Sequence, residues 1–186
     1  LSHIPNLVYL APTTYEELIA MESWAIKQDK YSVAIRVPVG KVYYSSNKYD
    51  ADYSSLNRFK VTKRGEQVAV IAAGNFYQKG ECVVEALRKD GIKATLINPR
   101  YLTGIDEALL EKLKQDHTVV ATLEDGTLDG GFGERITRFY GPSSMRVLNF
   151  GVKKQLYDRY DVDELLRENH LTNEQIVEDI TRLLAS

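Results

Sequence analysis

Short apolar runs alternate with helical patterns along most of the chain, and this alternation constrains the fold more than any other feature. The expected strands are 67–73, 93–98, 118–123 and 145–150, and the expected helices are 80–90, 106–115, 130–140, 162–168 and 172–185. Strands that alternate with helices of about 10–15 residues form right-handed βαβ crossovers, whose sheets are mainly parallel and covered by helices on both faces. The pattern therefore predicts a three-layer α/β domain over residues 63–186.

The first 45 residues contain a shorter strand–helix–strand unit. Residues 7–11 and 32–37 are its expected strands, and Thr14 begins a helix over 14–28. Thr14 and Glu17 fit a capping box, in which the hydroxyl accepts from the N3 amide and the carboxylate reaches back to the cap. Two strands and one helix, about one repeating unit of an α/β layer, bury too little apolar surface to be stable alone.

Residues 41–62 differ from both flanking regions, because they contain four tyrosines, several serines and alternating charges without a helical period. Tyrosine combines an apolar ring with a polar hydroxyl, which favours contact with a surface over free movement in solvent. Residues 46–62 are therefore the predicted linker between the two domains. A short edge strand is expected near Tyr43.

Composition excludes several classes of protein. The chain has 24 Lys+Arg against 26 Asp+Glu, a net charge of -2, whereas binding to a nucleic-acid backbone needs a basic surplus. No window approaches the roughly 18–20 unbroken apolar residues of a membrane span. The single cysteine, Cys82, cannot form an internal disulfide, which favours a reducing, cytoplasmic compartment. Its place on the apolar face of the expected helix 80–90 predicts a buried, inert thiol.

A glycine cluster at 130–133 lies between an expected strand and an expected helix, where backbone amides and the helix dipole form an anion site. However, the cluster lacks the G-x-G-x-x-G spacing, and Asp125, Asp129 and Glu134 would repel a phosphate. Close packing of the helix start against the sheet or a partner chain is the favoured interpretation. The residues assigned as interface candidates on this basis are Glu124, Gly130, Gly131, Phe132 and Gly133.

Arg36 lies near the carboxyl end of the apolar strand 32–37, where ligands gather in open α/β sheets. A guanidinium there offers a planar fork to a phosphate or a carboxylate. A salt bridge to a neighbouring Asp or Glu is an equally good interpretation of the same position. The histidines His3, His117 and His170 share no metal-ligand spacing. No catalytic or metal-binding constellation emerges from the sequence, so no catalytic residue is assigned.

Several motifs, in this order and spacing, resemble transketolase-like thiamine-diphosphate enzymes. Residues 4–13, the capped helix and residues 34–38 resemble the end of their pyrimidine-binding domain, which implies that residues 1–45 are the tail of such a domain. Five further stretches resemble their C-terminal domain: Asn98-Pro99-Arg100, Ile105-Asp106, residues 122–125, residues 130–133 and residues 149–151. The resemblance covers nearly the whole chain and is strongest for the 1-deoxy-D-xylulose-5-phosphate synthases. It implies a transketolase-type C-terminal domain at 63–186.

The resemblance also implies which parts of the enzyme lie elsewhere. In such enzymes a Gly-Asp-Gly motif holds magnesium and the diphosphate of the cofactor, and a Glu of the pyrimidine domain activates the cofactor ring. This sequence has no Gly-Asp-Gly, and the Glu is expected upstream of Leu1. Thiamine diphosphate and Mg²⁺ are therefore expected in the parent enzyme and not on this chain alone. Because the chain starts without Met, it is expected to be a fragment that is inactive by itself.

One active-site element is implied to survive, because an Arg on this strand contacts the substrate phosphate in transketolase-like enzymes and Arg36 matches its place. The synthases usually carry a second Arg three residues later, where this chain has Val39, and a Glu-Glu-His motif where it has Glu124-Asp125-Gly126. Both departures weaken the assignment to the synthases and leave the wider family intact.

The implied parent reaction is decarboxylation of pyruvate and transfer of the two-carbon unit to glyceraldehyde 3-phosphate. The fragment itself would serve subunit association, with a homodimer and the missing N-terminal domains as its partners. Two alternatives stay open. One is another transketolase or the β subunit of a 2-oxoacid dehydrogenase, and the other is a non-catalytic interaction module.

Overall fold

Five strands form the sheet of the larger, C-terminal part, in the order β3-β5-β4-β6-β7. The structure is a computed structural model that describes residues 1, 4–37 and 42–186. The strands are β3 (Lys60–Lys63), β4 (Gln67–Ala72), β5 (Thr95–Asn98), β6 (His117–Thr127) and β7 (Arg146–Val152). The four strands from β4 to β7 run parallel, and only β3, at the edge, runs antiparallel to its neighbour. The predicted mainly parallel sheet is confirmed.

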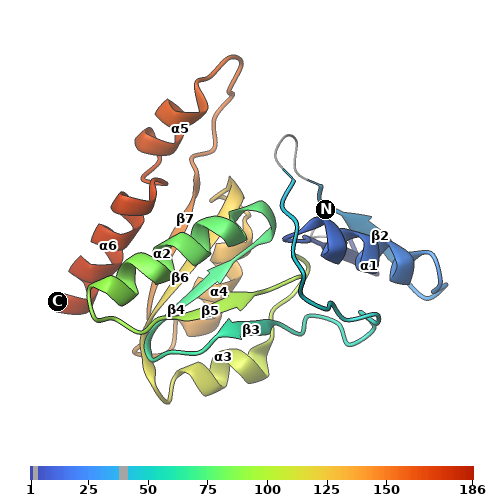
Figure 1. Ribbon diagram of the computed structural model, residues 1–186, viewed down its shortest axis with the longest axis horizontal. Helices are drawn as coiled ribbons and strands as arrows, with labels where there is room; N and C mark the ends of the chain where they lie inside the picture. Colours follow the sequence, from blue (N-terminus) through green and yellow to red (C-terminus); the bar gives the residue numbers. More distant parts are fainter. Residues whose placement is uncertain (2–3, 38–41) are drawn as a thin grey trace.

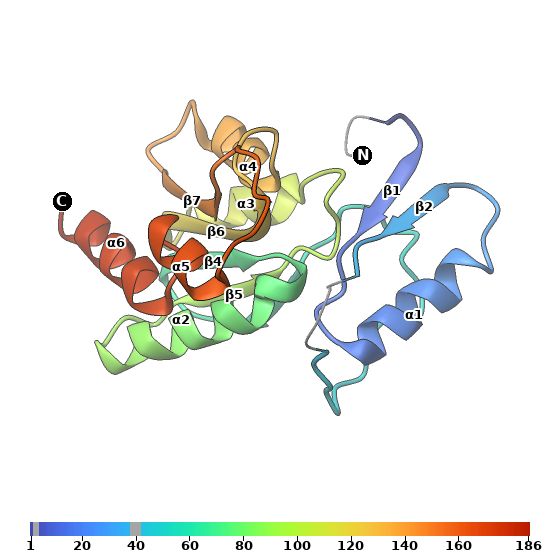
Figure 2. The same ribbon diagram turned by 90° about the horizontal axis from the view of Figure 1, so that it is seen from above.

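Helices cover both faces of this sheet, as Figure 2 shows. Side chains of β4 alternate between the two faces, with Val68 and Val70 in one core and Ala69 and Ile71 in the other. The first core is covered by α2 (Tyr77–Lys89) and α6 (Asn173–Ala185), and the second by α3 (Glu107–Leu113) and α4 (Phe132–Tyr140). The short helix α5 (Val162–Glu168) precedes α6. The predicted three-layer α/β fold is confirmed.

The N-terminal unit is a two-stranded parallel sheet with one helix, set beside the larger sheet (Figure 1). It consists of β1 (Leu7–Leu10), α1 (Tyr15–Ala25) and β2 (Ser32–Ile35). Half of the expected capping box is present, because Thr14 Oγ1 accepts from the amide of Glu17 at 3.3 Å. The other half is wrong: the Glu17 carboxylate is fully buried and accepts from the amide of Thr13 at 2.8 Å.

The segment between the two parts runs without a helix or strand through residues 42–59. The edge strand expected near Tyr43 is therefore not found among these residues, although the Tyr43 carbonyl accepts from the amide of Tyr15 at 2.8 Å. Tyr53 is 1% exposed and packs against residues of the N-terminal unit, so the segment lies against the surface as predicted. The C-terminal sheet begins at Lys60, before the expected boundary at 63. The short, polar sequence of β3 gave no strand signal.

Cys82 is exposed, which contradicts the prediction of a buried thiol. Helix α2 begins at Tyr77 rather than Gly80, and its buried residues are Gly80, Val83, Val84 and Leu87. These positions share one face at helical spacing, and Cys82 lies outside it. The cysteine was misassigned because apolar residues at 82, 83, 86 and 87 fit a face rotated by one residue.

Candidate functional site

Neighbouring strands β4 and β6 mark the place where an open α/β sheet usually binds a ligand. The chain leaves β4 through α2 toward β5, and it leaves β6 through α4 toward β7 on the other side. Such a reversal opens a crevice at the carboxyl ends of the strands. The N-terminal unit contacts this edge of the sheet: Ala11 is 1% exposed, and its amide donates at 2.8 Å to the carbonyl of Arg100, which follows β5. Residues of this unit also help to line two hollows, one around Arg36 and one beside α2.

The first hollow contains Arg36 and has a volume of about 180 Å³. Arg36 follows β2, and its amide donates to the carbonyl of Leu10 at 2.8 Å. Its Nη2 lies 2.9 Å from Oδ1 of Asp125, and about one third of its side chain is exposed. The wall is formed by Leu1, Tyr9, Leu102, Glu124, Gly126, Thr127, Gly130, Gly131 and Phe132. The salt bridge considered for Arg36 is thus present, and the guanidinium still faces an open space.

The N-terminus of α4 is occupied by a carboxylate of the same chain. Glu124 is 5% exposed, and its oxygens accept from the amides of Phe132 at 3.0 Å and Gly133 at 2.9 Å. A Cβ on Gly133 would lie 2.5 Å from Thr122 Oγ1, and a Cβ on Gly131 would lie 2.5 Å from Glu124 Oε1. The glycines therefore permit close packing of the helix start against the sheet, which was the favoured interpretation of this cluster.

The five interface candidates differ in exposure within the chain. Glu124, Phe132 and Gly133 are buried by contacts of the chain with itself, whereas Gly130 is exposed and Gly131 is half-buried. Gly130 and Gly131 thus remain accessible to a second chain. Contact with a partner stays a prediction for this segment.

Burial raises the pKa of Glu124 above its ordinary value of 4.5, while the amides of Gly133 and Phe132 act in the opposite direction. The folded protein then holds this proton more tightly than the unfolded chain. The contribution of Glu124 to the free energy of unfolding is therefore greatest below about pH 4.5 and decreases as the pH rises through the raised pKa.

We expect the wild type to lose stability relative to Glu124→Gln over this pH interval. Urea denaturation of both proteins, in steps from about pH 4 to about pH 8, measures the difference. A wild type that gains stability relative to the variant as the pH rises would contradict the assignment. Asp129→Asn, at an exposed position of the same loop, serves as the control.

Asn98, at the end of β5, joins the two parts of the molecule. Its Nδ2 donates to both carboxylate oxygens of Glu17, at 3.0 and 3.1 Å, and its Oδ1 accepts from the amide of Arg100 at 3.0 Å. Asn98 is 3% exposed, and Glu17 is fully buried. The Glu17 carboxylate also accepts from the Thr13 hydroxyl at 2.7 Å. Hydrogen bonds thus replace the water that both groups lose on burial.

Arg100 fixes the connecting segment in the same region. Its Nε donates to the carbonyl of Arg58 at 3.0 Å, and its Nη1 lies 2.5 Å from Oδ2 of Asp50. The guanidinium also lies over the rings of Tyr53 and Tyr101, 5.7 and 5.8 Å from their centroids. The Asn98-Pro99-Arg100 motif therefore contacts the N-terminal unit, the connecting segment and the sheet. From the sequence, this motif marked the end of a strand and contributed to the resemblance, but its contacts with the other two segments were not predicted.

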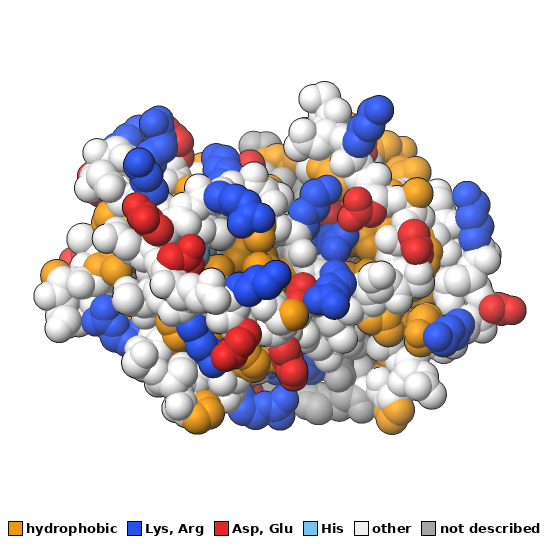
Figure 3. Space-filling model, turned by 90° about the horizontal axis from the view of Figure 1, so that it is seen from below, with side chains coloured by type: hydrophobic (Ala, Val, Ile, Leu, Met, Phe, Trp, Pro, Cys, Tyr) orange, Lys and Arg blue, Asp and Glu red, His pale blue; other side chains and the backbone are white. Residues whose placement is uncertain are grey.

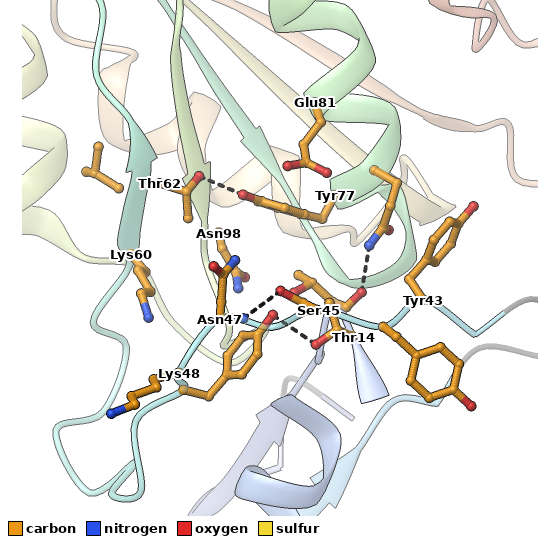
Figure 4. A pocket seen from close by; sticks show the side chains of 15 residues that line it. Thr14, Tyr43, Ser45, Asn47, Lys48, Lys60, Thr62, Tyr77, Glu81 and Asn98 are labelled. Carbon is orange, nitrogen blue, oxygen red and sulfur yellow. Dashed lines mark hydrogen bonds between the residues drawn. The ribbon is translucent and has the colours of Figure 1, made fainter. Parts of the chain in front are cut away.

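The second hollow, of about 510 Å³, lies between the N-terminal unit, the connecting segment and α2 (Figure 4). The sequence did not indicate it, because its wall combines residues from five separate stretches of the chain. The wall is formed by Thr13, Thr14, Tyr43, Tyr44, Ser45, Asn47, Lys48, Tyr49, Lys60, Val61, Thr62, Tyr77, Gln78, Glu81 and Asn98. It shares no residue with the wall of the Arg36 hollow.

The remaining candidates of the sequence are structural or surface residues. His117 is buried, with Nε2 2.8 Å from Thr95 Oγ1, and His170 lies at the surface beside Asp179. His3 and Val39 lie outside the described residues.

Across the described ranges, no three His, Cys, Asp or Glu side chains gather as a metal site, and no helix is long and apolar enough to cross a membrane. On the face in Figure 3, basic and acidic side chains are interspersed.

Comparison with known proteins places the chain in a family. Residues 57–176 match the family described as Transketolase, C-terminal domain. A 1-deoxy-D-xylulose-5-phosphate synthase of Clostridium tetani is 30% identical over 99% of this chain. One from Clostridium acetobutylicum is 32% identical over 88% of it. The chain spans 30% and 28% of the lengths of these two curated relatives.

Solved structures show the same fold. A chain titled split gene transketolase, inactive β4 tetramer, superposes with a TM-score of 0.80 at 22% identity, over 99% of this chain and 59% of the other. A transketolase mutant from Pichia stipitis gives 0.71 at 13% identity, over 98% of this chain and 26% of the other. Both structures share the three-layer α/β fold of the C-terminal part, and both matches also cover the N-terminal unit. The match of residues 57–176 shows that the chain belongs to the transketolase C-terminal domain family.

Proposed function

We propose that the chain acts as the C-terminal part of a thiamine-diphosphate-dependent transferase similar to 1-deoxy-D-xylulose-5-phosphate synthase. The parent enzyme would decarboxylate pyruvate and transfer the two-carbon unit to glyceraldehyde 3-phosphate. The names of the relatives support this proposal, and the similarity extends through the N-terminal unit as well as the C-terminal domain. The chain itself would hold the substrate phosphate and support subunit association.

The position of Arg36 carries the substrate part of the proposal. The residue follows β2 at the carboxyl edge, and its guanidinium opens into the first hollow. A Cβ at Gly126 would lie 3.5 Å from Nη1 of Arg36, so the absence of a side chain there leaves that side of the guanidinium open. Five N–H donors in a planar fork match the oxygens of a phosphate. The phosphate would compete with Asp125 for the same fork.

The N-terminal unit supports the view that the chain works with further polypeptide. Its sheet has two parallel strands, whereas parallel sheets are usually larger and covered on both faces. Apolar side chains of this unit are also exposed, including Ile4, Tyr15, Ile19, Ile26 and Val37. We propose that the remaining domains of the parent extend this sheet and cover these side chains.

The described residues do not fit thiamine diphosphate. Its diphosphate would require a magnesium ion held by oxygen ligands, and no cluster of three acidic, His or Cys side chains is found in the described part of the chain. The sequence contains no Gly-Asp-Gly. The cofactor and Mg²⁺ would therefore be bound by residues outside this chain, and no catalytic step is assigned to residues within it.

The proposed partners are these remaining domains and a second copy of the chain in a two-fold dimer. Accessible Gly130 and Gly131 are the interface candidates that a second copy would reach. The alternatives differ in where the diphosphate-binding residues lie. Fusion to the same polypeptide favours the synthase, and a separate polypeptide favours a 2-oxoacid dehydrogenase β subunit.

Calorimetry with thiamine diphosphate and Mg²⁺ tests whether this chain or the upstream domains bind the cofactor. We expect no measurable binding to the 186-residue chain, because its sequence has no Gly-Asp-Gly and its described residues hold no cluster of metal ligands. A polypeptide extended by the upstream domains should bind the cofactor and decarboxylate pyruvate. Tight binding to the 186-residue chain, or an extended protein without pyruvate decarboxylation, would overturn the proposal.

A further inference from the structure

A third hollow lies at the amino edge of the parallel sheet, where β3 and α2 end and β5 begins. Its volume of about 410 Å³ falls within the roughly 300–1,000 Å³ of typical ligand pockets. Figures 1 and 2 show that this end of α2 points away from the N-terminal unit. Its described wall shares no residue with the walls of the two hollows above.

Positive charge is concentrated in the wall of this hollow. Its basic residues are Lys63, Arg64, Arg88 and Lys93, and Glu85 is the one carboxylate among the described lining residues. Arg88 forms a salt bridge with Glu85. The other three cations form no salt bridge with the described residues. Since the whole chain has a net charge of -2, this positive surplus is local, and it suits a ligand with several negative charges.

Two backbone segments of the wall are fixed against each other. The amide of Glu66 donates to the carbonyl of Lys93 at 2.6 Å, and the amide of Gly65 donates to Thr95 Oγ1 at 3.0 Å. A Cβ at Gly65 would lie 2.0 Å from the Lys93 carbonyl oxygen, so only glycine permits this close approach. The contact holds the segment that carries Arg64 beside the segment that carries Lys93. Both cations are therefore in place before a ligand binds, which lowers the cost of binding.

The helix dipole accounts for only part of this charge. Arg88 and Lys89 lie in the last turn of α2, where cations compensate the negative end of the dipole. The three cations without a carboxylate partner lie outside the helix. Their field reaches into the hollow: the pKa of Glu85 lies below its ordinary value of 4.5, first because Arg88 donates to it and also because of the charges of Arg88, Lys63 and Lys89.

The helix side of the hollow suits an aromatic ring. Glu85 holds the Arg88 guanidinium in one orientation, because Nε donates to both carboxylate oxygens at 3.2 and 3.1 Å and Nη2 donates to Oε1 at 2.6 Å. A guanidinium offers a planar face on which an aromatic ring stacks. Val84 and Ala94, both buried, add apolar surface to the same wall. A flat ring joined to a chain of negative charges matches this arrangement.

We propose that this hollow binds a nucleoside triphosphate. The phosphate chain lies at Lys63, Arg64 and Lys93, which supply charge-assisted hydrogen bonds. The base stacks on the Arg88 guanidinium and contacts the apolar part of the wall. Because one exposed ion pair contributes little on its own, a chain of three phosphates that meets all three cations binds better than a single phosphate does. The proposed function of the chain makes no use of this hollow.

Titration calorimetry with ATP and the 186-residue chain tests this site directly. We expect a dissociation constant of about 0.1–1 mM, as for a small anion held mainly by exposed charged groups. Arg64→Gln combined with Lys93→Gln should weaken binding about tenfold, because two of the three phosphate contacts lose their charge. Lys112→Gln combined with Arg159→Gln is the matched control. It removes the same charges at exposed positions of α3 and of the loop between β7 and α5, and it should bind as the wild type does.

Tripolyphosphate and adenosine separate the two halves of the site. Each should bind at least about threefold more weakly than ATP, since each lacks one half of the contacts. Arg88→Lys keeps the charge and loses the planar face, so it should weaken the binding of ATP about threefold and leave that of tripolyphosphate unchanged. Equal binding of tripolyphosphate and ATP, unchanged binding by the Arg64 and Lys93 double variant, or no binding of ATP would each overturn the proposal. Because the titration needs neither thiamine diphosphate nor turnover, its failure is distinguishable from failure of the proposed transferase function.

Discussion

Replacing Glu17 by alanine is expected to lower the free energy of unfolding by about 4 kcal/mol, the range found when one partner of a buried charged network is removed. The carboxylate is fully buried and accepts from the Thr13 amide, the Thr13 hydroxyl and Asn98 Nδ2. Alanine leaves these donors, which belong to buried residues, without their acceptor, and each unsatisfied donor costs about 1–3 kcal/mol. Urea denaturation followed by circular dichroism measures the loss.

Glu22→Ala is the matched control, because Glu22 lies in the same helix and is exposed. It should change the stability by no more than about 0.5 kcal/mol. Asn98→Ala alone, and together with Glu17→Ala, completes a double-mutant cycle that isolates the coupling between the two side chains. If Glu17→Ala costs no more than Glu22→Ala, the carboxylate does not hold the two parts of the molecule together.

Local signals in the sequence predicted most elements of the fold, because each begins or ends at a residue with a distinct conformational role. Asp106 caps α3 by accepting from the Leu109 amide, as expected of an N-cap. Gly91 ends α2 at a φ of +82°, a conformation that glycine adopts without strain. The buried strand β4 was recognisable by its unbroken apolar run, and β6 by the apolar residues at 119–121 and 123.

Contacts between distant segments could not be predicted in the same way. Thr14 and Glu17 fit a local capping pattern, yet the Glu17 carboxylate points inward and accepts from Asn98 at the end of β5. Strand β3 is short and polar, and its place at the sheet edge depends on pairing with β5. The same limit applies to Arg36. From the sequence, a phosphate and a carboxylate were equally good partners for its guanidinium. The structure identifies Asp125, on β6, as the carboxylate partner.

The Arg36→Ala variant of the extended enzyme should lose about 10- to 100-fold in kcat/KM with a phosphorylated acceptor. This loss corresponds to about 1.5–3 kcal/mol for hydrogen bonds to a charged group. A non-phosphorylated acceptor should be affected little, because it makes no bond to the guanidinium. Arg36→Lys keeps the charge and loses the planar fork, so it should recover only part of the activity.

Kinetics with the two acceptors, measured side by side, test the account most directly. The control is Arg159→Ala, which removes an arginine from an exposed loop and should leave both kcat/KM values unchanged. The account predicts that Arg36→Ala reduces kcat/KM selectively for the phosphorylated acceptor. An equal reduction for both acceptors, or none for either, would contradict the assignment of Arg36 to the substrate phosphate.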